Sequence, residues 1–260
     1  MKMEELTGGR GGILRAGGAV HRPAGTWTRQ VHRLLEHVRH NGFMGAPQPL
    51  GFDEQGREIV SHIAGEVSNY PLSASAVSPE ALTSAATLLR RYHDATVDFL
   101  VLPGALDSWQ LPPRPPFEVV CHGDFAPYNV VLDGKRAVGI IDFDTAHPAP
   151  RVWDIAYALY RWAPLTNPKN HDGFGDLTTQ TARAVAFCDA YGLEASARRG
   201  LITLVADRLQ VLVDFMLAEA RAGNAAFEAN LSDGHHLLYI ADIAYIRDNA
   251  ERVERALLRE

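Results

Sequence analysis

Residues 117–144 read FEVVCHGDFAPYNVVLDGKRAVGIIDFD, and this stretch decides the predicted fold. Its apolar start at 117–121 predicts a buried strand. The pair Asp133-Gly134 is a strong hairpin signal, and it predicts that 130–132 and 137–141 form the two arms of a hairpin. The segment between the strand and the hairpin is therefore a loop that leads into a small sheet.

Three oxygen-bearing side chains fall at fixed places around this hairpin. If the two arms pair, Asn129 and Asp142 lie at the same end, beside the loop that carries Asp124. Mg²⁺ prefers oxygen ligands and is usually held by one or two carboxylates together with substrate phosphates. Asn129 and Asp142 can supply such ligands, and Asp124 can accept the proton of an attacking hydroxyl. Each residue alone also fits an ordinary turn or loop, but the joint pattern favours phosphoryl transfer.

The stretch resembles the aminoglycoside phosphotransferase family, within the protein-kinase-like superfamily. That family has a catalytic loop H-G-D-x-x-x-x-N, then a hairpin, then I-D-x-[DE], which correspond here to 122–129 and 141–144. The resemblance implies that Asp124 is the catalytic base and that His122 supports the loop. It also implies that Asn129 and Asp142 hold a metal ion, with Asp144 as a further candidate ligand, and that the cofactors are ATP and Mg²⁺.

The composition limits the other possibilities. The chain has 260 residues, 47% of them hydrophobic, which is enough for one large domain or two lobes. A net charge of −6 and the lack of a Lys/Arg-rich run argue against a nucleic-acid partner. Cys121 and Cys188 are far apart in apolar contexts, which is typical of buried free thiols in a reducing cytosol. No signal-peptide core or membrane-length segment stands out, so we expect a cytoplasmic protein, either a monomer or a weak homodimer.

Residues 1–66 are predicted to form a small nucleotide-binding lobe. The glycine-rich stretch 7–12 either approaches phosphates with its backbone or is a flexible amino-terminal segment. Strands are expected at 13–15 and 19–22, a helix at 28–40 capped by Thr28, and a hairpin at 50–52 and 58–63. Residues 61–66 then form a hinge, where the backbone of His62 and Ile63 can pair with a purine edge.

Arg22 is where the sequence departs most from the resembled fold, in which a strand lysine holds the phosphates and a helix glutamate pairs with it. Arg22 takes the lysine's place, and His32, not an acidic residue, is near the place of the glutamate. Arginine can hold phosphate bidentately, so Arg22 is predicted to bind the nucleotide, with His21 pointing the other way. The alternative is a solvated charge at a strand end.

The rest of the chain, 67–260, is predicted to be a larger and mainly helical lobe. Ser78-Pro79 begins a helix to about residue 97, 103–116 is a connector, and 147–150 is a turn. Further helices are expected at 152–162, 178–191, 195–222 and 234–258. Asp154 either buttresses the catalytic loop, as the resemblance implies, or is a first-turn carboxylate favoured by the helix dipole. Five further carboxylates either face a substrate amine or are surface charges: Asp172, Asp176, Asp207, Asp214 and Glu219.

The sequence therefore predicts an α+β, two-lobe, kinase-like fold and a Mg²⁺-dependent transfer of the ATP γ-phosphoryl group to a hydroxyl of a small molecule. The acceptor can be an aminoglycoside or similar antibiotic, and it is expected to be cationic if the carboxylates converge. Two alternatives remain open. One is a metabolic kinase acting on choline, ethanolamine, homoserine or a sugar, and the other is a catalytically weak nucleotide-binding protein.

Overall fold

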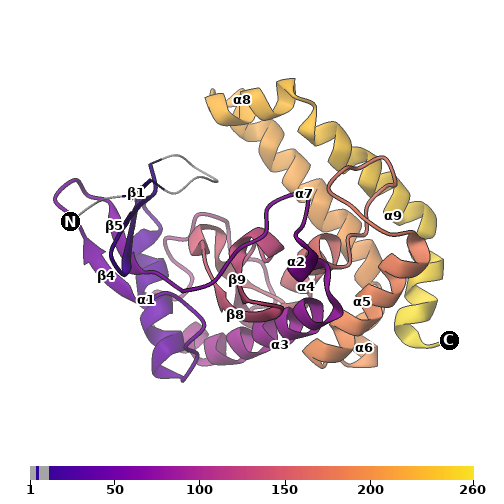
Figure 1. The fold of residues 1–260 in the computed structure, drawn as a ribbon, viewed down its shortest axis with the longest axis horizontal. Coiled ribbons are helices and arrows are strands. Elements are labelled where there is room, and N and C mark those ends of the chain that lie inside the picture. Colours follow the sequence, from indigo (N-terminus) through magenta and orange to yellow (C-terminus); the bar gives the residue numbers. More distant parts are fainter. Residues whose placement is uncertain (1–3, 6–11) are drawn as a thin grey trace.

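The computed structural model describes residues 4–5 and 12–260. A small antiparallel sheet and one helix lie at one end, and a larger helical part holds the carboxyl terminus (Figure 1). This is the α+β arrangement expected from the sequence, although the boundary near residue 66 remains a prediction. The glycine-rich stretch lies outside the described residues, apart from Gly12.

The amino-terminal sheet is antiparallel throughout, with the strand order β1-β2-β3-β5-β4. Both hairpins predicted in this part of the chain are confirmed. In the register of β3 and β5, Arg22 lies directly opposite Glu58, which places a cation and a carboxylate side by side. The strands are β1 Glu4–Glu5, β2 Leu14–Ala16, β3 Ala19–Arg22, β4 Pro49–Phe52 and β5 Glu58–Ser61.

Helix α1, Thr28–His40, packs its apolar stripe into the core, as predicted. The prediction that Thr28 caps this helix is wrong. The N-cap residue is Trp27, and Thr28 is the first helical residue. The hydroxyl of Thr28 instead accepts the Gly25 amide at 2.9 Å, so it stabilises the turn that precedes the helix.

The hairpin predicted from 130–132 and 137–141 is confirmed as β7 Val130–Asp133 and β8 Arg136–Ile140, with its turn one residue later than predicted. Asp133 pairs with Arg136, which leaves Gly134 and Lys135 as the turn. The turn predicted at 147–150 is wrong, since β9 His147–Ala149 pairs with β6 Val119–Cys121. Proline cannot donate a backbone hydrogen bond, but it is tolerated in the edge strand of so small a sheet.

The helical part contains the predicted helices with two corrections. The helix predicted over 195–222 is interrupted by Gly200, which has φ 71°, a conformation that ends a regular helix at low cost for glycine. Helices α2 and α8 were not predicted. The helices are α2 Ala74–Val77, α3 Pro79–Thr96, α4 Arg151–Trp162, α5 Leu177–Tyr191, α6 Ala195–Arg198, α7 Leu201–Arg221, α8 Ala225–Ser232 and α9 His235–Leu258.

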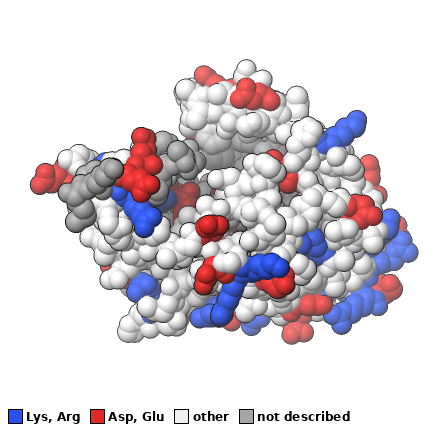
Figure 2. Space-filling model, in the orientation of Figure 1, with Lys and Arg blue, Asp and Glu red and all other residues white. Residues whose placement is uncertain are grey.

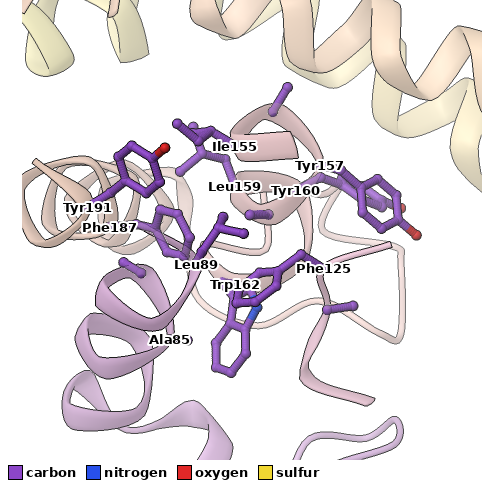
Figure 3. Packing of buried hydrophobic residues seen from close by; sticks show 14 of the residues in the cluster. Ala85, Leu89, Phe125, Ile155, Tyr157, Leu159, Tyr160, Trp162, Phe187 and Tyr191 are labelled. Carbon is purple, nitrogen blue, oxygen red and sulfur yellow. The ribbon is translucent and has the colours of Figure 1, made fainter. Parts of the chain in front are cut away.

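Helix α4 runs through the centre of the core, and all of its residues from Trp153 to Trp162 are buried. Leu89 of α3 and Phe187 of α5 lie on one side of it, and Tyr157 and Tyr160 lie on the other (Figure 3). A helix that is apolar around most of its circumference is expected in the interior of a protein. Cys121 and Cys188 are free and buried, as predicted. In the described part of the chain, no helix has the length and apolar character needed to span a membrane.

Candidate active site

His122 and Asn129 tie the catalytic loop to the end of the hairpin. The His122 Nε2 atom donates to the Ile141 carbonyl at 2.9 Å, and its Nδ1 atom accepts the Asp124 amide at 3.3 Å. The Ile141 amide donates to the Asn129 carbonyl at 2.9 Å. The structure therefore brings Asp124, Asn129 and the start of the IDFD segment together, as the sequence predicted.

Asp154 lies beneath this loop and accepts three hydrogen bonds. The amides of His122 and Gly123 donate to it at 2.7 and 3.0 Å, and His93 Nε2 donates at 3.0 Å. Gly123 has φ 83°, and a Cβ atom there would lie 2.4 Å from the Thr145 carbonyl oxygen, so only glycine fits. This arrangement fits the support role that the resemblance implies for Asp154.

Hydrogen bonds stabilise the ionised form of Asp154. Burial disfavours its ionised form, but the bonds from His93 and from the backbone lower the pKa of Asp154 to about 2. Burial lowers the pKa of His93 despite the neighbouring carboxylate. We therefore take His93 as neutral, donating from Nε2 to Asp154 and accepting the Tyr191 hydroxyl at Nδ1, at 2.7 Å.

The low pKa of Asp154 predicts an acid-labile loop. Its pKa in the unfolded chain is about 3.9, so its stabilising effect is complete above that pH and is lost as the pH falls from about 4 to 2. The change corresponds to about 2–3 kcal/mol of unfolding free energy. Asp154→Asn is expected to cost about as much or more at pH 7, because an amide cannot accept all three bonds. Denaturant unfolding at pH 7 and pH 2 measures both effects, and about half of the loss should be present at pH 3.

The control is Asp207→Asn, because Asp207 is exposed on α7, where its nearest cation is Arg247 at 3.7 Å. This variant should change the unfolding free energy little. If Asp154→Asn unfolded with the wild-type free energy at pH 7, the support role would be refuted.

Asp124 is mostly enclosed, and both of its carboxylate oxygens are engaged. Tyr128 donates its hydroxyl to one oxygen at 2.7 Å, and Asn129 donates its amide nitrogen to the other at 2.9 Å. Burial raises the pKa of Asp124 above its usual range, although the Tyr128 bond opposes the rise. A carboxylate with a raised pKa is a better proton acceptor, which suits a general base.

The residues proposed to hold a metal ion carry suitable donor atoms. Because Asn129 turns its amide nitrogen toward Asp124, its side-chain oxygen is the atom that a cation can take. Asp142 and Asp144 both contact Arg22, so their carboxylates lie close together. Asp142 has φ 62°, a strained conformation for a residue other than glycine, and such strain is often found at functional sites. An amide oxygen and two carboxylates match the oxygen donors that Mg²⁺ prefers.

Arg22 points toward these carboxylates, and its neighbour His21 points away, as predicted. The Arg22 guanidinium donates to Asp142 at 2.7 Å and also to Asp144 and Glu58. His21 instead bonds to Asp53 at 2.9 Å. Burial disfavours the charge of Arg22, but the three carboxylates raise its pKa, so this guanidinium remains protonated.

Glu58 is the partner of Arg22 that the sequence reasoning missed. Its side chain is 1% exposed, and its second oxygen bonds to His32 of α1 at 3.0 Å. Glu58 of β5 therefore lies between Arg22 of β3 and His32 of α1 and contacts both side chains. A search for an acidic residue on the helix could not find it, whereas the antiparallel pairing of β3 with β5 places it directly opposite Arg22.

The predicted hinge is partly engaged by the protein itself. The His62 amide donates to the Gly18 carbonyl at 2.8 Å, and Glu66 exchanges backbone bonds with Leu132 at 2.8 and 2.9 Å. The backbone of His62 therefore offers only its carbonyl to a purine while this bond holds. The Ile63 side chain packs against Gly139, where a Cβ atom would lie 2.8 Å from it. Purine binding by this segment stays a prediction.

The five carboxylates considered for substrate binding do not share one environment. Asp172 is half-buried, and its charge acts on Tyr70, whereas three others are held by neighbours in the chain. Asp176 caps α5 by accepting the Thr179 amide at 2.9 Å, and Asp214 accepts from Gln210 at 3.0 Å. Glu219 accepts from Asn224 at 3.1 Å. On the face seen in Figure 2, acidic and basic side chains are interspersed. For Asp176, Asp214 and Glu219, these contacts favour the surface interpretation over a shared acidic cleft.

Comparison with known proteins identifies the group to which the chain belongs. A model of the phosphotransferase enzyme family (APH) matches residues 102–199, which include the whole catalytic loop and hairpin. The trifolitoxin immunity protein of Rhizobium leguminosarum bv. trifolii is 32% identical over 246 residues, covering 90% of this chain and 88% of that protein. This chain belongs to the phosphotransferase enzyme family.

Solved structures share the fold of this phosphotransferase. A choline/ethanolamine kinase family protein from Mesorhizobium loti has a TM-score of 0.65 at 17% identity, covering 100% of this chain and 93% of that one. Amicoumacin kinase, solved with AMP-PNP, Ca²⁺ and Ami, has a TM-score of 0.60 at 11% identity, covering 89% and 88%. The kinase-like fold and the membership of a phosphotransferase family are thus confirmed. By its family, the protein is a small-molecule phosphotransferase.

Proposed function

We propose that this phosphotransferase moves the γ-phosphoryl group of ATP, together with Mg²⁺, to a hydroxyl of a small molecule bound at Asp124. The observation that carries the proposal is the convergence at the end of one hairpin of a candidate base, candidate metal ligands and a cation. These are Asp124, Asn129, Asp142 and Arg22, and they come from both the sheet and the helical part. Phosphoryl transfer depends mostly on positioning and on charge stabilisation, which this arrangement offers.

In the proposed reaction, the acceptor hydroxyl gives its proton to Asp124 as its oxygen forms a bond to the γ-phosphorus. The bond from that phosphorus to the bridging oxygen of ADP breaks, and the proton then passes from Asp124 to water. A bound Mg²⁺ would neutralise the phosphate charge, and Asn129 with Asp142 and Asp144 would hold it. Arg22 would bind phosphate oxygens, with Glu58 fixing its orientation from the side of the sheet.

The geometry argues against the alternative of a catalytically weak binding protein. That alternative rested on the missing lysine–glutamate pair, but Arg22 and Glu58 form an ion pair in which Glu58 is buried. The relative named as a trifolitoxin immunity protein supports an acceptor that is a toxin, which phosphorylation would inactivate. The metabolic kinase is the second candidate, and the likeness to a choline/ethanolamine kinase family protein supports it at the level of the fold.

The proposal predicts that ADP release requires a divalent ion and an acceptor. We expect turnover with Mg²⁺ and ATP in a panel of antibiotics and hydroxylated metabolites, with one product heavier by a phosphoryl group in mass spectrometry. We also expect weak Mg²⁺ binding alone and tighter binding with ATP, because two or three protein ligands form an incomplete shell. Activity in excess chelator would contradict the metal site, and acceptor-independent ADP release with every compound would contradict the transferase.

A further inference from the structure

A second cation lies close to Asp124. The guanidinium of Arg161 is surrounded by the rings of five tyrosines, which we call the tyrosine cage. Its central carbon is between 4.8 and 5.7 Å from the five ring centroids. The cage consists of Tyr70, Tyr128, Tyr157, Tyr160 and Tyr239.

Hydrogen bonds connect this cation to the candidate base. Arg161 donates from Nε to the Tyr157 hydroxyl at 3.0 Å, and that hydroxyl lies 3.1 Å from the hydroxyl of Tyr128. Tyr128 in turn donates to Asp124 at 2.7 Å. An acceptor whose reacting hydroxyl met Asp124, as in the proposed function, would therefore have the cage within reach.

Three of the five tyrosines of the cage are partly exposed to solvent. Tyr157, Tyr160 and Arg161 belong to α4 and are buried. Tyr70, Tyr128 and Tyr239 are only half-buried, and they come from the linker after β5, the catalytic loop and α9. Figure 3 shows Tyr157 and Tyr160 together on the side of α4 that faces away from Phe187. Three chain segments that are distant in sequence thus provide the open rim, and α4 provides the floor.

Within the described residues, the hydrogen bonds of Arg161 go to hydroxyl groups. They reach Tyr157 at 3.0 Å and Tyr239 at 2.8 Å, and Arg161 is 7% exposed. Two carboxylates lie near enough for their charges to act on Arg161, and both are engaged elsewhere. Asp242 accepts from Tyr160 at 2.8 Å and from Asn170 at 2.6 Å, and Asp124 accepts from Tyr128 and Asn129. Keeping a cation buried without an ion-pair partner is costly, and aromatic faces compensate for only part of that cost. An incoming anion is therefore favoured at this place.

We propose that the tyrosine cage and Arg161 bind the carboxylate group of a hydroxyl-bearing acceptor. The proposal rests on the proposed function, because the hydroxyl of the same molecule would meet Asp124. A planar guanidinium matches a carboxylate with two parallel bonds, and the half-buried tyrosine rings cover the apolar part of the ligand. A cationic group at the same place would meet the charge of Arg161 and be repelled. Because the cage holds one guanidinium, we expect the ligand to carry one negative charge there.

Two probes of nearly equal size separate charge from shape: N-acetyl-L-homoserine carries one negative charge and its primary amide carries none. A third probe, L-homoserinamide, lacks the acetyl group and carries one positive charge on its amine, so it tests whether a cation is accepted at all. Acceptor-dependent ADP release gives kcat/KM for each, and the shift in Tm at saturating probe measures binding without turnover. We expect the carboxylate to exceed the amide by about 10–100-fold in kcat/KM, mainly through KM, the range for a hydrogen bond to a charged group.

Substitutions at Arg161 should change this preference selectively. Arg161→Gln is expected to reduce the carboxylate-to-amide ratio to near one, and Arg161→Lys to restore part of it. Because Arg161 is buried, Tyr239→Phe is the safer variant if the glutamine variant fails to fold. It removes one hydroxyl that fixes the guanidinium and should lower the ratio severalfold. The control is Arg183→Gln on α5, since Arg183 bonds to the carbonyls of Trp162 and Val77 and should leave the ratio unchanged.

The outcomes also separate this inference from the proposed function. A higher kcat/KM for the amide or the amine than for the carboxylate would overturn the carboxylate site and leave the phosphotransferase intact. Absence of both binding and turnover with the carboxylate probe would overturn it as well. A Tm shift by the carboxylate probe that Arg161→Gln abolishes would support the site, even if no compound in the wider panel were phosphorylated and the proposed function failed.

Discussion

Asp124→Asn is expected to lower kcat by about 10²–10⁴-fold, the usual contribution of a general base, while ATP binding and the unfolding free energy stay near the wild-type values. The amide keeps the size of the side chain and can still contact Tyr128 and Asn129, but it cannot accept the hydroxyl proton. Acceptor-dependent ADP release and a nucleotide titration measure the two effects. Asp133→Asn, at the exposed end of β7 beside the hairpin turn, is the matched control.

The pH profile provides an independent check of this role. Burial raises the pKa of Asp124, and a base must be ionised to accept a proton. The wild-type kcat should therefore be constant at high pH and fall as the pH drops through that raised pKa, which lies above the usual value for aspartate of about 3.9. The residual rate of Asp124→Asn should lack this acidic limb. A variant that kept most of its activity would refute both the base and the proposed reaction.

Arg22→Ala is expected to lower kcat/KM for ATP by about 10²–10³-fold, comparable to the loss of one preorganised electrostatic donor. Both a higher KM and a lower kcat should contribute, because the cation faces phosphates before and during transfer. Arg22→Lys should recover part of the loss, since it restores a charge but not two parallel bonds. His21→Ala should have little effect, because His21 contacts Asp53 on the other side of the strand.

Glu58→Gln tests the positioning role of the buried carboxylate. We expect it to raise KM for ATP in the same direction as Arg22→Lys, because the guanidinium loses the partner that holds it from the sheet side. Steady-state kinetics at fixed acceptor measures all four variants. If His21→Ala were severe and Arg22→Ala mild, the assignment of the phosphate-binding cation would be wrong, whatever the effect of Glu58→Gln.

Local signals in the sequence were sufficient to predict the hairpin that follows Asn129 and several helix boundaries. Asp133-Gly134 predicted the hairpin, and Ser78 caps α3 as its sequence context indicated, accepting the Ala81 amide at 3.2 Å. In both cases the residues that decide the structure are neighbours in the chain. The opposite directions of the His21 and Arg22 side chains were also predictable from the sequence, because successive residues of a strand point to opposite faces.

The features that were missed depend on contacts between distant segments. Glu58 lies 36 positions from Arg22, and their pairing follows only from knowing that β3 pairs with β5. The contact of Arg161 with Tyr239 joins α4 to α9 across 78 positions, and no short pattern encodes it. The strand β9 was mistaken for a turn because proline is rare in strands, and only its pairing with β6 makes the edge position evident.

Helix α4 has a consequence for how this enzyme could acquire new specificities. Asp154, Tyr157 and Arg161 follow one another at intervals of three and four residues, so a single face of the helix both supports the catalytic loop and forms the floor of the tyrosine cage. A change on that face that improved binding of a new acceptor would also disturb the loop. Changes in acceptor choice are therefore expected at cage positions outside α4, such as Tyr70 and Tyr239, because substitutions there leave the hydrogen bonds of Asp154 to the loop in place.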